Sequence, residues 1–273
     1  MTSTKNRLGK CEGSSAGTGK SQSKAPDPEA GGDYFDREYF VFHEGKKKYF
    51  GAIIRILRNH MPRDARRILD VGSGYGFLLH LLEERGFETY GIEQSAKAAE
   101  RSRSTCRGTV SVQDAQKAFP FPSSHFDAIV MNDIVEHLAD YRSCLSEVFR
   151  TLVEGGVLFV QTANGYSVAR LLLGKKWFWY CDPTHVHIFN PRTLQSALRG
   201  QGFEILRSKA FFNFCQVGET TKWLKPLRRI GRMTPFPFFG DSFYILARKP
   251  QVCPKTMRKE TGPRRDEAGR AKF

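Results

Sequence analysis

The chain has 273 residues, a length that fits one large α/β domain with tails or two small domains. Its 40% hydrophobic and 12% aromatic residues are enough to bury a core, which excludes a chain that is disordered throughout. The formal net charge of +15 indicates an acidic partner, such as nucleic acid, an anionic membrane surface or a phosphorylated metabolite.

Cysteine usage and the lack of targeting signals predict a cytoplasmic location. The six cysteines are scattered and form no C-x-x-C pair, which indicates reduced thiols. No stretch approaches the run of about 18 apolar residues that a transmembrane helix needs. The N-terminus lacks the apolar core of a secretory signal, while its basic, serine-rich composition leaves an organelle transit peptide as an alternative.

Composition divides the chain into a central domain and two tails. Residues 1–32 and 251–273 are polar and basic, so we expect both to be disordered. The stretch GSSAGTGKS in the first tail is not a P-loop, because Ser14 stands where that motif needs glycine and no apolar strand precedes it. One domain is therefore expected over 33–250, with an insertion at 212–241.

Within the domain, short apolar runs alternate with segments of helical periodicity. Strands are predicted at 66–72, 88–94, 109–114, 126–133, 156–164, 203–211 and 242–249. Helices are predicted at 77–86, 95–103, 141–156 and 192–202, after a helical cover at 33–54. Strands separated by helices imply parallel pairing with right-handed crossovers, so a doubly wound α/β fold is expected.

The first predicted strand opens into a glycine-rich turn, Gly72-x-Gly74-x-Gly76. A dinucleotide fingerprint would be G-x-G-x-x-G, and Phe77 stands where its last glycine belongs. The physical use of the glycines is the same in both motifs: the backbone can approach a ligand closely, next to an electropositive helix start.

Five segments carry a family resemblance: ILDVGSGYG, GIEQS, QDAQKAFPFPSSHFDAIVMNDIVEHL, VLFVQTAN and GFEI, in this order over residues 66–205. The ordered set resembles the class I S-adenosylmethionine-dependent methyltransferases, of the ubiquinone-biosynthesis O-methyltransferase kind and of types 11 and 23. The resemblance implies a Rossmann-like, seven-stranded sheet with six parallel strands and an antiparallel last strand.

The resemblance also implies which residues bind S-adenosylmethionine. Gly72, Ser73 and Gly74 would line its methionine part, and Glu93 would accept hydrogen bonds from the ribose hydroxyls. Asp114 would lie near the adenine amino group, unless it is a simple helix cap. The complete set implied is Asp70, Gly72, Ser73, Gly74, Glu93, Gln94, Asp114, Ala115 and Asn132.

A polar cluster follows the predicted strand 126–133: Asp133, Glu136 and His137. Its D-x-x-E-H pattern resembles the E-x-x-E-H of ubiquinone-biosynthesis and small-RNA 2′-O-methyltransferases, in which such residues hold a divalent metal. His187, in the context H-x-F, would be the fourth ligand, and the set suits Mg²⁺, Mn²⁺ or Zn²⁺. The alternative is a site without metal, in which Glu136 shapes the pocket and His137 is the base.

These features favour methylation of a hydroxyl on a small or lipid-like acceptor, with Glu136, His137 and His187 as catalytic residues. Two alternatives remain at this stage: an RNA 2′-O-methyltransferase and a non-catalytic cofactor-binding module. The aromatic segment 175–183 predicts either a lid over the acceptor or a hydrophobic plug. The basic insertion 212–241 predicts contact with phosphates or a membrane surface, or a solvated loop.

Overall fold

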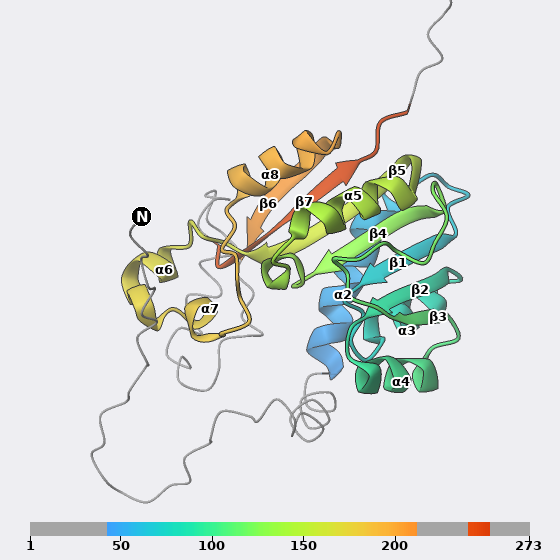
Figure 1. Ribbon diagram of the computed structural model, residues 1–273, viewed down its shortest axis with the longest axis horizontal. Coiled ribbons are helices and arrows are strands. Elements are labelled where there is room, and N and C mark those ends of the chain that lie inside the picture. The colour runs from blue at the N-terminus through green and yellow to red at the C-terminus, as the bar shows by residue number, and fades with distance from the viewer. Residues whose placement is uncertain (1–42, 212–239, 252–273) are drawn as a thin grey trace, which may run out of the picture.

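The computed structural model describes residues 43–211 and 240–251, which form a twisted sheet covered by helices (Figure 1). The sheet has seven strands in the order β3-β2-β1-β4-β5-β7-β6. The strands are β1 (Arg67–Val71), β2 (Glu88–Glu93), β3 (Thr109–Val112), β4 (Phe126–Asn132), β5 (Leu152–Ala163), β6 (Glu204–Phe211) and β7 (Ser242–Arg248). Only β7 is antiparallel to its neighbours, so the predicted arrangement of six parallel strands and an antiparallel last strand is confirmed.

The helices are α2 (His43–Arg58), α3 (Phe77–Glu83), α4 (Ala96–Thr105), α5 (Tyr141–Thr151), α6 (Val168–Leu173), α7 (Phe178–Cys181) and α8 (Pro191–Gly200). Two short 3₁₀ turns, η1 (Val135–His137) and η2 (Gly174–Lys176), lie between them. Side-chain caps begin several helices: Ser95 accepts from Ala98 N–H, and Asp140 accepts from Ser143 N–H. The sequence therefore sets these helix starts locally.

Alternate residues of the central strands feed two cores, because successive side chains of a strand point to opposite faces. On one face, Ile129 and Met131 of β4 pack with α5 and α8. On the other face, Ala128 and Val130 pack with α2 and α3. Helices on both faces are what the alternating pattern of strands and helices predicts.

The predicted boundary between α5 and β5 is wrong. The amphipathic pattern predicts a helix through Gly156, but α5 ends at Thr151 and β5 begins at Leu152, which pairs with Phe126. Sheet pairing overrides the helical period here, and Gly155 takes a left-handed φ of 78°. Residues 33–42 of the predicted cover, nearly all of the 212–241 insertion and both predicted tails except residue 251 lie outside the described residues.

The register brings the ends of the central strands to one level. Val71, the last residue of β1, pairs with both Ile92 of β2 and Met131 of β4. The strand order reverses between β1 and β4, and in open α/β sheets ligands bind at such a switch point, outside the carboxyl ends of the strands. In the part of the chain that the structure covers, no helix is long and apolar enough to cross a bilayer.

Candidate functional site

The turn after β1 uses its three glycines for different purposes. All have positive φ values: 78° at Gly72, 52° at Gly74 and 77° at Gly76. A Cβ at Gly76 would lie 2.2 Å from the Ser102 hydroxyl oxygen, so this glycine permits close packing against α4. A Cβ at Gly74 would have no described atom within 4 Å, so this residue borders open space at the end of the sheet. Gly74 is therefore the turn residue best placed to face a ligand.

Glu93, at the end of β2, is fixed beside this turn. Its two carboxylate oxygens accept hydrogen bonds from the backbone N–H groups of Gly74 and Ser95, each at 2.8 Å. Each oxygen has a second lone pair, so the carboxylate can still accept hydrogen bonds from a ligand. Asp70 lies behind the turn and is buried; burial, then the charge of Glu93, raises its pKa to about 8. Gln94 is exposed next to Glu93.

Asp114 and Ala115 follow β3 at the same edge of the sheet. Asp114 Oδ1 accepts from the backbone N–H of Gln116 at 2.9 Å, which closes a turn rather than capping a helix. Ala115 is 6% exposed and belongs to the core. Asp114 therefore closes a local turn instead of capping a helix, and the residue as a whole is half-buried.

A polar network joins the tip of β4 to helix α2. The Tyr49 hydroxyl of α2 contacts Asn132 Oδ1 at 2.5 Å and also contacts Gln161 Oε1. Asp133 has an unusual positive φ of 52°, and its carboxylate accepts from the side-chain amides of Asn132 at 3.1 Å and Gln161 at 3.3 Å. Sequence reasoning missed Tyr49 and Gln161, since both lie in segments that read simply as cover helix and buried strand.

Asp133 is therefore occupied by amide donors. Burial raises its pKa to about 6, although the hydrogen bonds from Gln161 and Asn132 act in the opposite direction. Asp133 is not part of the group of potential metal ligands found among the described residues, which consists of Glu136, His137 and His185.

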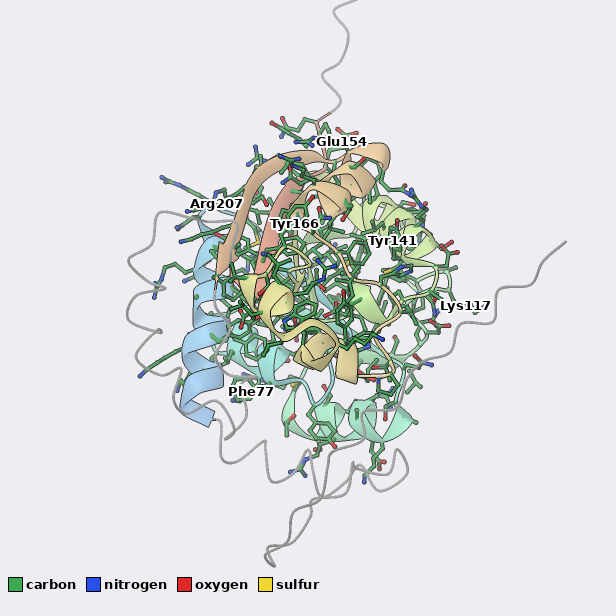
Figure 2. The ribbon with its side chains drawn as sticks, turned by 90° about the vertical axis from the view of Figure 1, so that its left-hand side faces the viewer. Phe77, Lys117, Tyr141, Glu154, Tyr166 and Arg207 are labelled. Atoms are coloured by element: carbon green, nitrogen blue, oxygen red, sulfur yellow. The ribbon has the colours of Figure 1, made fainter. Side chains whose placement is uncertain are left out.

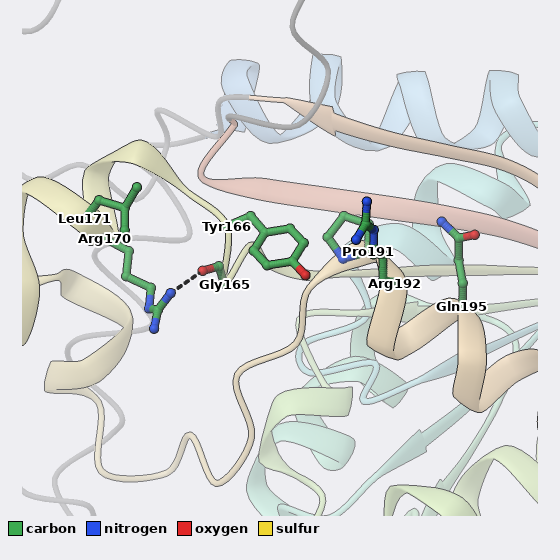
Figure 3. Close-up of a pocket in the computed structure, with 7 residues that line it drawn as sticks. All are labelled: Gly165, Tyr166, Arg170, Leu171, Pro191, Arg192 and Gln195. Atoms are coloured by element: carbon green, nitrogen blue, oxygen red, sulfur yellow. Dashed lines mark hydrogen bonds between the residues drawn. The ribbon is translucent and has the colours of Figure 1, made fainter.

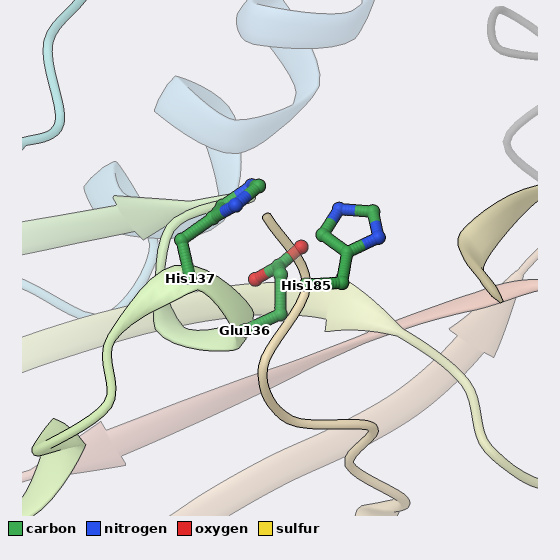
Figure 4. A group of neighbouring side chains, drawn as sticks. All are labelled: Glu136, His137 and His185. Atoms are coloured by element: carbon green, nitrogen blue, oxygen red, sulfur yellow. The ribbon is translucent and has the colours of Figure 1, made fainter. Parts of the chain in front are cut away.

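Those three side chains face one another at the end of β4 (Figure 4). One potential ligand atom from each lies within 4.8 Å of the others. Glu136 is fully buried, and neither of its carboxylate oxygens has a hydrogen-bond partner among the described residues. The Thr162 hydroxyl is close enough to favour the charged form slightly, but it does not reach hydrogen-bond geometry. Burial, then the charge of Asp133, raises the pKa of Glu136 to about 8.

Both imidazoles are oriented by backbone carbonyls. His137 Nδ1 lies 3.2 Å from the Thr184 carbonyl oxygen, and His185 Nδ1 lies 2.8 Å from the Trp179 carbonyl oxygen. A carbonyl only accepts, and the Thr184 hydroxyl, 3.0 Å from His137 Nδ1, already donates to Asp182, so each Nδ1 carries the proton. In the neutral imidazoles each Nε2 then has a lone pair, and His185 Nε2 lies 3.7 Å from the Asp182 carboxylate. Burial, then the nearby His185 ring, lowers the pKa of His137. The cluster thus offers two imidazole lone pairs and one buried carboxylate.

His187 is not in this cluster, contrary to the ligand set expected from the sequence. Its Nε2 lies 3.3 Å from the Ala139 carbonyl oxygen, and its ring packs against Tyr141 and Phe189. The N–H groups of Val186 and His187 both donate to the Glu136 carbonyl oxygen, at 3.0 and 3.1 Å. These two hydrogen bonds turn the chain, and His185 takes the place predicted for His187.

The tryptophans of the aromatic segment form a plug. Trp177 and Trp179 are 2% and 5% exposed and pack with Ala163. The Trp179 ring also lies 5.0 Å from the ring of His185. The sequence left residues 175–183 as either a lid or a hydrophobic plug. These two side chains form a plug, packed behind the histidine cluster.

Comparisons with known proteins agree with this geometry. Residues 41–208, more than half of the chain, match the sequence profile of a family described as a methyltransferase domain. A ubiquinone biosynthesis O-methyltransferase of Paramagnetospirillum magneticum is 27% identical over 68% of this chain and 74% of its own length. The nonribosomal peptide synthetase CymA of Salinispora arenicola is 34% identical over 39% of this chain, but only 2% of that protein is matched.

A solved structure supports the fold. The crystal structure of an S-adenosylmethionine-dependent methyltransferase from Archaeoglobus fulgidus superposes with a TM-score of 0.57. The match covers 77% of this chain and 99% of the other, at 23% identity. Identity this low supports the fold alone, because one fold carries many activities.

The strand order reverses between β1 and β4, an open glycine turn follows β1, and a carboxylate stands at the end of β2. Together these features define a nucleotide-type ligand site in a Rossmann-like fold. The chain belongs to the methyltransferase domain family, in the class I S-adenosylmethionine-dependent group. It is an S-adenosylmethionine-dependent methyltransferase, and S-adenosylmethionine is its co-substrate.

The buried carboxyl groups predict that stability falls as the pH rises. Asp70 and Glu136 have pKa values raised from 3.8 and 4.5 to about 8, so the folded chain holds protons that the unfolded chain has released. The free energy of unfolding should therefore decrease by a few kcal/mol between about pH 5 and about pH 8.5. Urea denaturation of the ligand-free protein measures it, and Glu136→Gln should reduce the decrease. Stability that rises over this window would contradict the assignment.

Proposed function

We propose that this methyltransferase acts on a hydroxyl oxygen of a small or lipid-like acceptor. The cofactor would lie over Gly74, with Glu93 on the ribose and Asp114 and Ala115 near the adenine. The open space at Gly74 and the fixed carboxylate of Glu93 support this placement. Asn132, at the tip of β4, would close the methionine end, held by the Tyr49 hydroxyl.

The acceptor would enter beside η1, where the histidine cluster lies. The relative from Paramagnetospirillum is named for O-methylation in ubiquinone biosynthesis, which favours an aromatic ring hydroxyl as the acceptor group. The acceptor oxygen forms a bond to the methyl carbon while the carbon–sulfur bond breaks, so the sulfonium becomes a neutral thioether. The hydroxyl proton must leave as this happens, because a neutral hydroxyl is a weak nucleophile.

One observation carries the assignment of this chemistry: the fully buried Glu136 carboxylate has both oxygens unpartnered between two imidazoles. Without a partner, burial keeps the Glu136 carboxyl protonated near neutral pH, so it becomes a charged ligand only when a bound cation replaces the proton. One carboxylate and two imidazole nitrogens are a suitable donor set for a divalent cation, and each imidazole donates its other N–H to a carbonyl, as metal-ligating histidines do. A cation held by Glu136, His137 and His185 would lower the pKa of the acceptor hydroxyl.

The same residues can also act without a cation. His137 keeps a free lone pair on Nε2, and its lowered pKa leaves the imidazole neutral near pH 7, so it can accept the hydroxyl proton. The plug of Trp177 and Trp179 would then keep water from the cluster. Nothing in the comparisons supports an RNA acceptor or a non-catalytic module, and neither is proposed.

Calorimetric titration of Mn²⁺ into the purified chain separates the two forms of the proposal. We expect binding by the wild type, loss of binding in Glu136→Gln and His185→Ala, and retained binding in His187→Ala. The last variant is a matched control, since His187 lies close by but outside the cluster. If the wild type binds no Mn²⁺, Mg²⁺ or Zn²⁺, the form of the proposal with a cation is wrong, and the form with His137 as the base remains.

A further inference from the structure

The exposed apolar side chains of the described residues are concentrated in one segment. All the large exposed ones except Val112 lie between residues 166 and 186. Leu171 and Leu172 of α6 are 72% and 80% exposed. Single exposed apolar residues are ordinary, but a concentration of this kind marks an interaction surface.

Helix α6 presents this apolar face while being fixed to the body of the protein. None of its six residues is buried, and Val168, Leu171 and Leu172 share one side of the helix. Its other side is held: the Arg170 guanidinium donates to the Gly165 carbonyl oxygen at 2.6 Å and to the Tyr180 hydroxyl at 2.7 Å. The leucines are therefore exposed on an anchored element.

The surface is apolar and mainly basic; its one acidic residue among those between 166 and 186, Asp182, lies 3.7 Å from His185 Nε2, at the end next to the histidine cluster. Residues 164–181 contain no aspartate or glutamate, but they contain Arg170, Lys175 and Lys176. Lys175 is exposed immediately after the leucines. Arg192, also exposed, lies across a cavity of about 440 Å³ between α6 and α8, whose walls include Tyr166 and Leu171 (Figure 3). Exposed leucines flanked by cations match the two layers of an anionic lipid surface, with headgroups outside and acyl chains beneath.

We propose that α6 and η2 form a docking surface for an anionic membrane. Leu171 and Leu172 enter the acyl region, while Lys175 and Arg192 contact the headgroups. Figure 2 looks onto the end of the molecule where α6 and α7 lie in front of the strand ends. The segment continues from α7 into the chain at Thr184–His187 that packs on Glu136, so docking would place the proposed acceptor site next to the lipid. This last point rests on the proposed function; the docking surface itself does not.

Flotation of the full-length chain with vesicles tests the surface without cofactor or acceptor. We expect binding to equimolar phosphatidylcholine and phosphatidylglycerol, and much weaker binding to phosphatidylcholine alone. Leu171→Glu/Leu172→Glu should lower the partition coefficient about tenfold or more, since two side chains no longer enter the apolar layer. Lys175→Glu should lower it about fivefold or more and make it less sensitive to salt.

Val112→Glu is the matched control, because Val112 is 46% exposed on β3, outside this segment, and should bind vesicles like the wild type. The variants of Leu171, Leu172 and Lys175 should bind S-adenosylhomocysteine as the wild type does, so a failure of docking is distinguishable from a failure of the proposed function. Vesicle binding that is unchanged in the leucine variant would overturn the proposal. So would a wild-type dimer that this variant dissociates without any vesicle binding, because a second copy would then cover the leucines.

Discussion

Gly74→Val should lower the affinity for S-adenosylhomocysteine by at least about a hundredfold, or about 2.8 kcal/mol. The valine side chain would occupy the open space next to Gly74 that the cofactor needs. The protein itself has no described atom within 4 Å of the new Cβ, so the main cost to folding is the left-handed φ of 52°, about 1–3 kcal/mol. Calorimetric titration gives the affinity, and urea denaturation gives the stability.

Gly86→Val is the control for this experiment. Gly86 also has a positive φ, of 82°, and open space around its Cβ position, but it precedes β2, at the opposite edge of the sheet. The two variants should lose similar stability, and only Gly74→Val should lose cofactor affinity. Equal affinities of both variants for S-adenosylhomocysteine would contradict the placement of the cofactor at the turn after β1.

His137→Ala should lower turnover by about a hundredfold to ten-thousandfold, the usual contribution of a positioned acid–base group. Affinity for S-adenosylhomocysteine should stay nearly unchanged, because Gly74 and Glu93 hold the cofactor through separate contacts. His187→Ala should have a much smaller effect on turnover, since the His187 ring packs on Tyr141 and Phe189 outside the cluster.

The pH profile of the wild type distinguishes the role of His137. Burial and the His185 ring lower its pKa, so a base at this position stays neutral and active to a lower pH than an exposed histidine, and activity falls only below that pKa. Chelators leave a base active, whereas a cation site loses activity to a chelator and regains it when a divalent ion is added. Full turnover by His137→Ala would contradict both roles and make the cluster structural.

Local signals in the sequence account for the sheet and for the turn that opens the site. A continuous apolar run predicts β4 as a strand buried on both faces, and glycine is the residue that tolerates the positive φ values after β1. Glu93 can also be picked out as a candidate from the sequence, because its position at the end of a strand does not depend on distant contacts. The end of α5 was not, since the pairing of Leu152 with Phe126 decides it.

The histidine assignment failed for a similar reason. Whether His185 or His187 joins Glu136 depends on two backbone N–H groups that donate to the Glu136 carbonyl, a contact between segments distant in the chain. Tyr49 could not be identified either, because its contacts with Asn132 and Gln161 arise only when α2 packs on the sheet. The exposure of Leu171, Leu172 and Leu173 in α6 depends on tertiary packing in the same way, so the sequence alone does not show it.

The most direct test of O-methylation is the fate of the methyl carbon. The wild-type chain would be incubated with ¹³C-methyl-labelled S-adenosylmethionine and an aromatic acceptor carrying adjacent ring hydroxyls, with Glu136→Gln/His137→Ala as the inactive control. We predict that NMR finds the label in a methoxy group in the wild-type reaction and not in the control. Label attached to carbon or nitrogen instead, or equal methoxy formation by both proteins, would contradict hydroxyl methylation at the cluster of Glu136, His137 and His185.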